Sequence, residues 1–237
     1  MSVSYEEWST AIDRVVCRAL EAAEVDEPPV DTFCVAERLK HSVLIDDGLP
    51  VRGYRKQVGG ESYILLGLDE RSERMHFATA HELGESLAAS VCLQVAEIEL
   101  ECVSERLRED LANRIASRLL CPNPWFTDDA RRCGYDLLWL KQLYCTASHE
   151  VIGRRLLEVD DVPATLTVYD NQAVTLRLAN FGRCPPPTSS EQQCWRRCHE
   201  SAQAESDDID GLMIQAWPVH EDGWKREILR TTAADQF

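Results

Sequence analysis

Apolar residues recur at helical spacing along most of the first two-thirds of the chain. The first such stretch predicts an amphipathic helix whose apolar face is formed by Trp8, Ile12, Val15, Val16 and Leu20. By the same criterion, helices are expected at about 31–39, 72–92, 104–120 and 189–202, and residues 128–159 are expected to form a helix, a short turn and a helix. The 72–92 helix has an inward stripe of largely small residues, which are Phe77, Ala80, Leu83, Gly84, Leu87 and Ala88.

Alternating or β-rich runs predict strands in two separate parts of the chain. The first part holds three candidates, at 41–47, 53–57 and 62–69. After Pro163 the pattern changes to two alternating strands around an Asp170–Asn171 turn. The chain closes with a hairpin that turns at Asp222–Gly223, and the acidic stretch 205–210 before it is expected to be a loop. These elements predict an α+β fold, with a first domain at residues 1–160 and a small β-rich appendage of unknown role at 161–237.

Composition narrows the class of protein. The 237 residues are 44% hydrophobic and 28% charged, which is typical of a globular protein. The formal net charge of -16 disfavours direct nucleic-acid binding, because phosphates would be repelled. It suits a basic protein partner, although solubility alone is the preferred explanation. The N-terminus lacks a basic segment followed by an apolar one, and no apolar run has membrane-spanning length. We therefore expect a cytoplasmic protein without membrane association.

The 10 cysteines are scattered without a CxxC pair, so we expect them to be reduced and mostly buried. One local cluster comprises Cys184, Cys194, Cys198 and His199. These four residues could bind zinc, but their spacing matches no common zinc module. Placement of the last three on one helix is the preferred interpretation.

The segment HELGE, residues 81–85, combines residue types suited to metal chemistry. His81 and Glu85 are four residues apart, so on a helix both can reach one ion. Glu82 is rotated from His81 by about 100° and can serve as a general base without being a ligand. A metal hydrolase also needs a third ligand from another element. The following helix region offers Glu101, Glu105, Glu109 and Asp110, and spacing alone does not choose among them.

Four fragments carry a resemblance to a known family: PPVDTFCVAERL, RMHFATAHELGE, REDLANRIASRLLCP and ASHEVIGRRL. In their order and spacing, from about Pro28 to Leu157, the chain resembles the ImmA/IrrE family of zincin-like metallopeptidases. The resemblance implies a small mixed sheet packed on helices, with His81 as a metal ligand, Glu82 as the general base and Glu109 as the third ligand. Glu105 has no counterpart in the family pattern.

The chain departs from that family at Glu85, where the family has its second histidine. A glutamate reaches about as far, so the ligand set becomes His81, Glu85 and Glu109. Zinc is still the expected ion, but an oxygen-rich set moves the preference toward manganese or ferrous iron. The added negative charge is also expected to make water at the ion less acidic.

Other side chains are weaker candidates. His76, His149 and His220 could each supply the missing imidazole, although a packing or surface role is expected for all three, with His220 facing solvent. Tyr54 could donate a hydrogen bond to a developing oxyanion, but a half-buried strand tyrosine is preferred.

The predicted function is hydrolysis of a peptide bond in a regulatory protein. The resemblance implies a helix-turn-helix repressor as the substrate, and the acidic surface suits such a basic, DNA-binding partner. Two alternatives stay open. One is a catalytically degenerate, protease-like module that binds a partner without cutting it, and the other is a hydrolase of a small amide.

Overall fold

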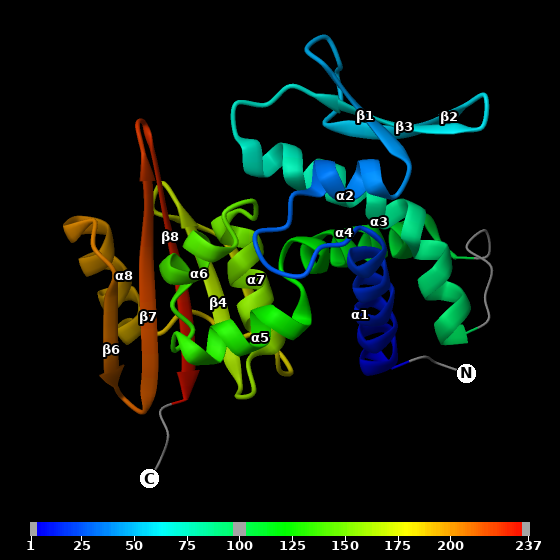
Figure 1. The fold of residues 1–237 in the computed structure, drawn as a ribbon. Coiled ribbons are helices and arrows are strands. Elements are labelled where there is room, and N and C mark those ends of the chain that lie inside the picture. The colour runs from blue at the N-terminus through cyan, green and yellow to red at the C-terminus, as the bar shows by residue number, and fades with distance from the viewer. Residues whose placement is uncertain (1–3, 97–102, 234–237) are drawn as a thin grey trace. The chain divides into compact units, whose positions relative to one another are not determined.

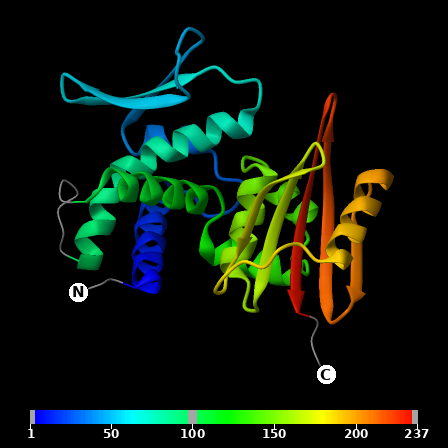
Figure 2. The ribbon, with the colours of Figure 1, turned by 180° about the vertical axis from the view of Figure 1, so that it is seen from behind.

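The computed structural model describes residues 4–96 and 103–233, and within them the chain forms two compact units. The N-terminal unit comprises residues 1–129 and 141–148, and the C-terminal unit comprises residues 130–140 and 149–237 (Figures 1 and 2). Eight helices and two separate sheets among the described residues make the fold α+β, as predicted.

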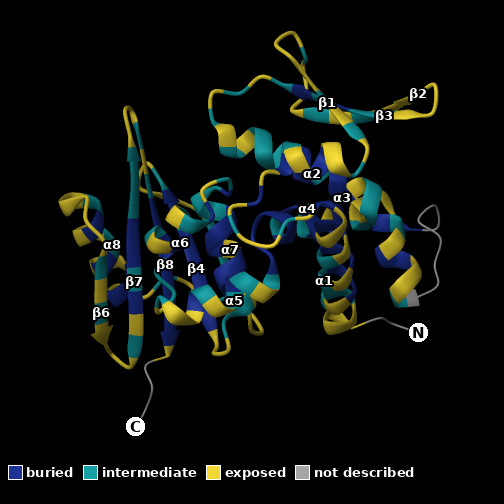
Figure 3. Ribbon diagram, in the orientation of Figure 1, coloured by how far each residue is buried: buried dark blue, intermediate teal, exposed yellow. Residues whose placement is uncertain are grey.

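Helices form most of the N-terminal unit. They are α1 (Tyr5–Ala22), α2 (Thr32–Arg38), α3 (Ser72–Ala96) and α4 (Glu105–Leu120), followed by the first part of α5 (Asn123–Arg132) and the last part of α6 (Leu137–Leu143). Ser4 and Glu7 form a capping box that satisfies free backbone amides at the start of α1. The predicted apolar face of α1 is confirmed, because Ile12, Val15 and Leu20 are buried there. In α1, α3 and α4 the buried residues lie on the sides of the helices that pack against neighbouring elements (Figure 3).

A three-stranded sheet completes the N-terminal unit. It consists of β1 (His41–Asp46), β2 (Gly53–Val58) and β3 (Glu61–Gly67), in the order β1-β3-β2. β1 runs parallel to β3 and β2 runs antiparallel to it, so the sheet is mixed. β2 and β3 both contact α3, and β1 contacts α2. The three strands agree with the three predicted ones.

Close packing of α3 against α4 determines the geometry of the metal-ligand candidates. A Cβ atom added to Gly84 would lie 2.5 Å from the carbonyl oxygen of Ala112 and 3.0 Å from its Cα. Real Cβ atoms essentially never approach so near, and only glycine fits at this crossing. The stripe of small residues predicted on α3 is confirmed at Ala80, Gly84 and Ala88, which are all buried. The two helices can therefore bring side chains one turn away from Gly84 and Ala112 onto a common centre.

The C-terminal unit is built on a five-stranded antiparallel sheet. Its strands are β4 (Ala164–Asp170), β5 (Ala173–Ala179), β6 (Glu205–Ile209), β7 (Leu212–Glu221) and β8 (Trp224–Ala233), in the order β5-β4-β8-β7-β6. The two predicted hairpins join through pairing of β4 with β8. The first turn lies one residue later than the predicted Asp170–Asn171, at Asn171 and Gln172, whose positive φ angles of 46° and 71° are typical of a tight two-residue hairpin turn.

Helices cover both faces of this sheet. α7 (His149–Val159) contacts β4 and β8, and a Cβ at Gly153 would touch Leu166 and Ile228. α8 (Ser189–Ser201) contacts β6, β7 and β8 on the other face, where Cys194 and Cys198 pack against Ala216 and Leu229. The preferred helical placement of these two cysteines is confirmed.

The structure differs from the sequence-based expectations at three places. The acidic stretch expected as a loop at 205–210 contains β6, whose Glu205 and Asp207 both form ion pairs with Arg197 of α8. The region 128–159 contains α6 as a separate helix between α5 and α7. The boundary expected after residue 160 also lies elsewhere, because α7 packs on the five-stranded sheet and belongs to the C-terminal unit.

Candidate metal centre

Three predicted ligand residues converge on one point of the N-terminal unit. His81 and Glu85 lie one turn apart on α3, and Glu109 lies on α4. One ligand atom from each residue lies within 4.8 Å of the other two. The Nε2 atom of His81 is 3.9 Å from Oε1 of Glu85 and 3.6 Å from Oε2 of Glu109. The structure thus brings all three together, and Glu105 is not part of the group. Glu101 lies outside the described residues.

Asn113 orients the two ligand candidates that do not share a helix. Its Oδ1 atom lies 3.1 Å from Nδ1 of His81, and its Nδ2 atom donates a 3.0 Å hydrogen bond to Oε1 of Glu109. Because Oδ1 can only accept, Nδ1 of His81 is the donor in this contact, and in the neutral imidazole the lone pair is therefore on Nε2. That lone pair lies at the nitrogen nearest the two carboxylates. Asn113 was not identified from the sequence, although it follows Glu109 by one turn of the same helix.

Glu82 lies beside this group in a different environment. It is only 5% exposed, whereas the Glu85 and Glu109 side chains are 48% and 59% exposed. Burial, together with the negative charge of Glu85, raises the pKa of the Glu82 carboxyl to about 7, and the nearby His81 and Arg55 partly oppose this rise. Its Oε2 atom has no hydrogen-bond partner among the described residues. A buried oxygen left without a partner is costly, so a group that accepts or donates a proton there would relieve it.

The donor set fits a divalent metal ion. One neutral imidazole nitrogen and two carboxylates leave at least one coordination position for another ligand. The imidazole proton is held on the far nitrogen by Asn113, as is usual for metal-binding histidines. The carboxyl of Glu82 interacts electrostatically with His81 and Glu85 but is not a member of this group. The His/Glu group can therefore hold a metal ion, as predicted for His81, Glu85 and Glu109.

The weaker candidates have other surroundings. His76 packs against α2, where its Nδ1 atom is 3.0 Å from the Thr32 hydroxyl and its ring contacts Phe33, so the expected packing role is confirmed. Tyr54 is 39% exposed on β2. His149 begins α7 in the C-terminal unit. Burial raises the pKa of both Cys194 and Cys198 to about 12, which disfavours their thiolate forms as zinc ligands.

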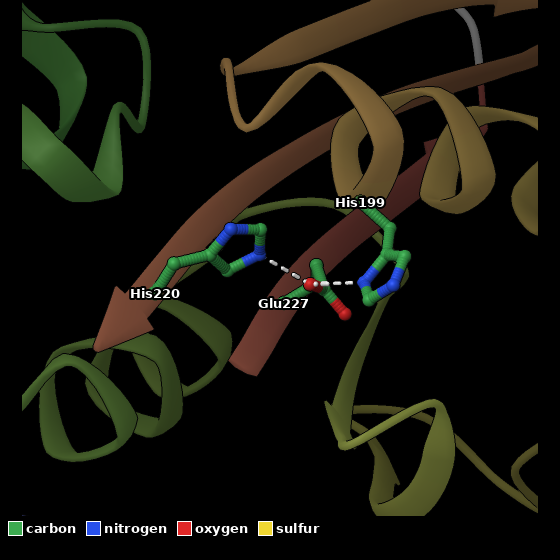
Figure 4. Close-up of side chains that lie close together, drawn as sticks. All are labelled: His199, His220 and Glu227. Atoms are coloured by element: carbon green, nitrogen blue, oxygen red, sulfur yellow. Dashed lines mark hydrogen bonds and ion pairs between the residues drawn. The ribbon is translucent and has the colours of Figure 1, made fainter. Parts of the chain in front are cut away.

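The C-terminal unit contains a second His/Glu group that the sequence did not reveal. His199 of α8, His220 of β7 and Glu227 of β8 offer ligand atoms within 4.8 Å of one another (Figure 4). The expectation that His220 faces solvent is wrong, because its side chain is 17% exposed and its Nε2 atom is 2.6 Å from Oε1 of Glu227. The predicted hairpin already places residues 220 and 227 on one face, since His220 pairs with Lys225. Only the docking of α8 on that face was not foreseeable.

Comparison with known proteins gives a fold relative and no family. No protein-family model and no curated protein sequence matches the chain. Among solved structures, a Mycobacterium tuberculosis transcriptional regulator is similar with a TM-score of 0.68 and 17% sequence identity, over 94% of this chain and 75% of that one. At this identity the likeness establishes a shared fold only. Among the described residues, no helix is both long enough and apolar enough to cross a membrane.

Proposed function

We propose that the N-terminal unit is a metal-dependent peptidase that hydrolyses a peptide bond in a regulatory protein. The observation that carries the proposal is the convergence of His81, Glu85 and Glu109, together with a buried Glu82 whose Oε2 atom has no hydrogen-bond partner among the described residues. An ion bound there would act as a Lewis acid toward water and toward the scissile carbonyl. Zinc is the first expectation, with manganese or ferrous iron as alternatives for this oxygen-rich set.

In this proposal Glu82 is the general base. A carboxyl with a pKa of about 7 can both take and return a proton near neutral pH, which is what the two halves of hydrolysis require. Its free Oε2 atom would take the proton of the attacking water and later deliver it to the leaving amine. Asn113 would serve as a positioning residue, because it holds both His81 and Glu109.

The proposed substrate is a basic helix-turn-helix repressor. The net charge of -16 on this chain favours association with a positively charged partner. The structural relative is named a transcriptional regulator, which is compatible with a role in a transcriptional circuit. Charge alone does not select a cleavage position, so the proposal extends to the class of substrate only.

A second candidate function is a binding module that retains the peptidase scaffold without activity. The exposure of Glu85 and Glu109 favours this reading, because exposed carboxylates hold an ion less firmly than enclosed ones. The name of the structural relative also fits a regulator that acts by binding. The two candidates differ in whether Glu82 is needed.

The test combines the metal-loaded chain with any small, basic helix-turn-helix regulator found encoded next to its gene. We expect the wild-type chain to cut this regulator and Glu82→Gln to cut it at least 100-fold more slowly while binding the same amount of metal, since general-base catalysis contributes about 10²–10⁴-fold. Glu105→Gln is the matched control, because Glu105 lies on α4 outside the ligand group. An uncut regulator with zinc, manganese and ferrous iron alike, or full activity of Glu82→Gln, would exclude the peptidase.

A further inference from the structure

Glu227 is a buried carboxylate with unusual partners. Its side chain is 0% exposed, yet the residues that contact its oxygens in the described structure are His199, His220 and Trp195, none of which is an arginine or lysine. Two other deeply buried carboxylates of the same unit, Glu191 and Asp160, are each paired with an arginine. A buried carboxylate needs a compensating positive charge. Among the described residues, the side chains placed at Glu227 to supply or bind such a charge are two imidazoles.

The two oxygens of Glu227 have separate roles. Oε2 accepts a 2.9 Å hydrogen bond from the indole nitrogen of Trp195, which fixes the carboxylate plane. Oε1 lies between the imidazoles, 2.8 Å from Nδ1 of His199 and 2.6 Å from Nε2 of His220 (Figure 4). The indole of Trp195 stacks with the rings of both Tyr169 and His199. One oxygen is thus anchored, and the other lies in contact with one nitrogen of each imidazole.

The separations among these atoms are close to those of a coordinated ion. Zinc holds nitrogen and oxygen ligands at about 2.0–2.1 Å in a tetrahedron, which places neighbouring ligand atoms about 3.3 Å apart. The observed 2.6 and 2.8 Å contacts would have to open by about 0.5–0.7 Å, and the two imidazole nitrogens already lie within 4.8 Å of each other. The hydrogens that now face Oε1 would then leave or move to the other ring nitrogens. The His199 and His220 side chains are 16% and 17% exposed, so an ion can reach them from solvent.

We propose that His199, His220 and Glu227 form a second divalent-metal site, which binds zinc and joins α8 to the β7–β8 hairpin. Two imidazoles and one carboxylate are a common zinc ligand set, and the indole of Trp195 supports the carboxylate from behind. The site is independent of the peptidase proposal, because its ligands lie in the C-terminal unit. Its expected effect is a more stable C-terminal unit in the presence of zinc, since the ion binds the folded form.

The test uses the full-length chain without an affinity tag, stripped with chelator and kept reduced. Every protein compared carries His81→Ala, which removes the candidate metal site of the N-terminal unit. The outcome therefore does not depend on the peptidase proposal. Cobalt(II) then serves as a spectroscopic substitute for zinc. We expect His81→Ala to bind one equivalent with visible d–d absorption and without the intense near-ultraviolet band of thiolate ligation, and we expect zinc to raise its melting temperature.

Removing either imidazole of the second site should abolish this signal. We expect His81→Ala/His220→Ala to lose at least 100-fold in cobalt affinity and to lose the zinc-dependent rise in melting temperature, and His81→Ala/His199→Gln to behave alike. His81→Ala/His149→Gln is the matched control, since it removes a histidine outside both groups. Circular dichroism identifies any variant that fails to fold, and two independent variants keep the test decisive. Absence of cobalt binding by His81→Ala, a thiolate spectrum, or unchanged binding in both double variants would overturn the proposal.

Discussion

Replacement of Gly84 by alanine tests whether the α3–α4 crossing holds the metal ligands in place. The added Cβ would lie 2.5 Å from the Ala112 carbonyl oxygen, and ordinary contact begins at 3.4 Å. The helices must therefore separate by about 0.9 Å at this point, or distort locally. Metal–ligand distances are tolerated only within about 0.2 Å. Glu109 would then move away from His81 by several times that tolerance.

Two opposing effects determine the change in stability. Overpacking of this kind costs about 1–3 kcal/mol in the free energy of unfolding. Alanine favours the helix over glycine by about 1 kcal/mol, so the net loss is expected to be between about 0 and 2 kcal/mol. Metal affinity is the sharper measurement. We expect the dissociation constant for zinc at the first group to rise at least tenfold, as when supports of a ligand are lost.

The measurement is isothermal titration with zinc on the His220→Ala background, so that only the first group titrates. Gly182→Ala is the matched control, because a Cβ at Gly182 meets nothing within 4 Å. An unchanged zinc affinity in Gly84→Ala, together with a stability gain of about 1 kcal/mol from helix propensity alone, would refute the reasoning.

Three further predictions concern the same centre. In metal-free protein at pH 8, Glu82→Gln should be more stable than wild type. Burial raises the pKa of the Glu82 carboxyl from 4.5 to about 7, so the wild-type folded state loses stability as pH rises through that range. Urea unfolding should show a difference in the free energy of unfolding on the order of 2–3 kcal/mol at pH 8 that vanishes near pH 4.5, and a pH-independent difference would contradict the prediction. Asn113→Ala should weaken zinc binding about 10–100-fold, because it loses the hydrogen bonds to His81 and Glu109. Asn113→Asp should lose less zinc affinity than Asn113→Ala. Equal zinc affinity in both variants and the wild type would show that these hydrogen bonds do not matter. Glu85→His should raise the affinity for zinc relative to manganese, measured by competition titration, and no change in that ratio would mean that residue 85 is not a ligand.

Helical periodicity accounts for how much of the first site was predictable. His81 and Glu85 share a helix, so their spacing alone predicts that both side chains can reach one point. The choice of Glu109 over Glu105 depends on how α4 docks against α3, and periodicity says nothing about docking. The family resemblance supplied that choice, and the tight approach at Gly84 explains why the geometry permits it.

Tertiary contacts explain what the sequence did not reveal. The acidic run at 205–210 lacks an alternating apolar pattern, yet β6 forms at the sheet edge, where backbone pairing with β7 and ion pairs with Arg197 compensate for it. The helical pattern of α7 shows an apolar face but not which sheet covers it, so the domain boundary could not be located. Sequence patterns also did not reveal the group around Glu227, because its partners come from two other elements, whose packing the patterns do not show.

The most direct test of the first site is a crystal of the tag-free chain soaked with zinc and measured at the zinc absorption edge. We expect an anomalous peak about 2.0–2.2 Å from Nε2 of His81 and from carboxylate oxygens of Glu85 and Glu109, with Glu82 beside the ion but outside its ligand set. A well-ordered α3–α4 crossing with no peak between these three residues, or a peak whose ligands exclude His81, would contradict the account.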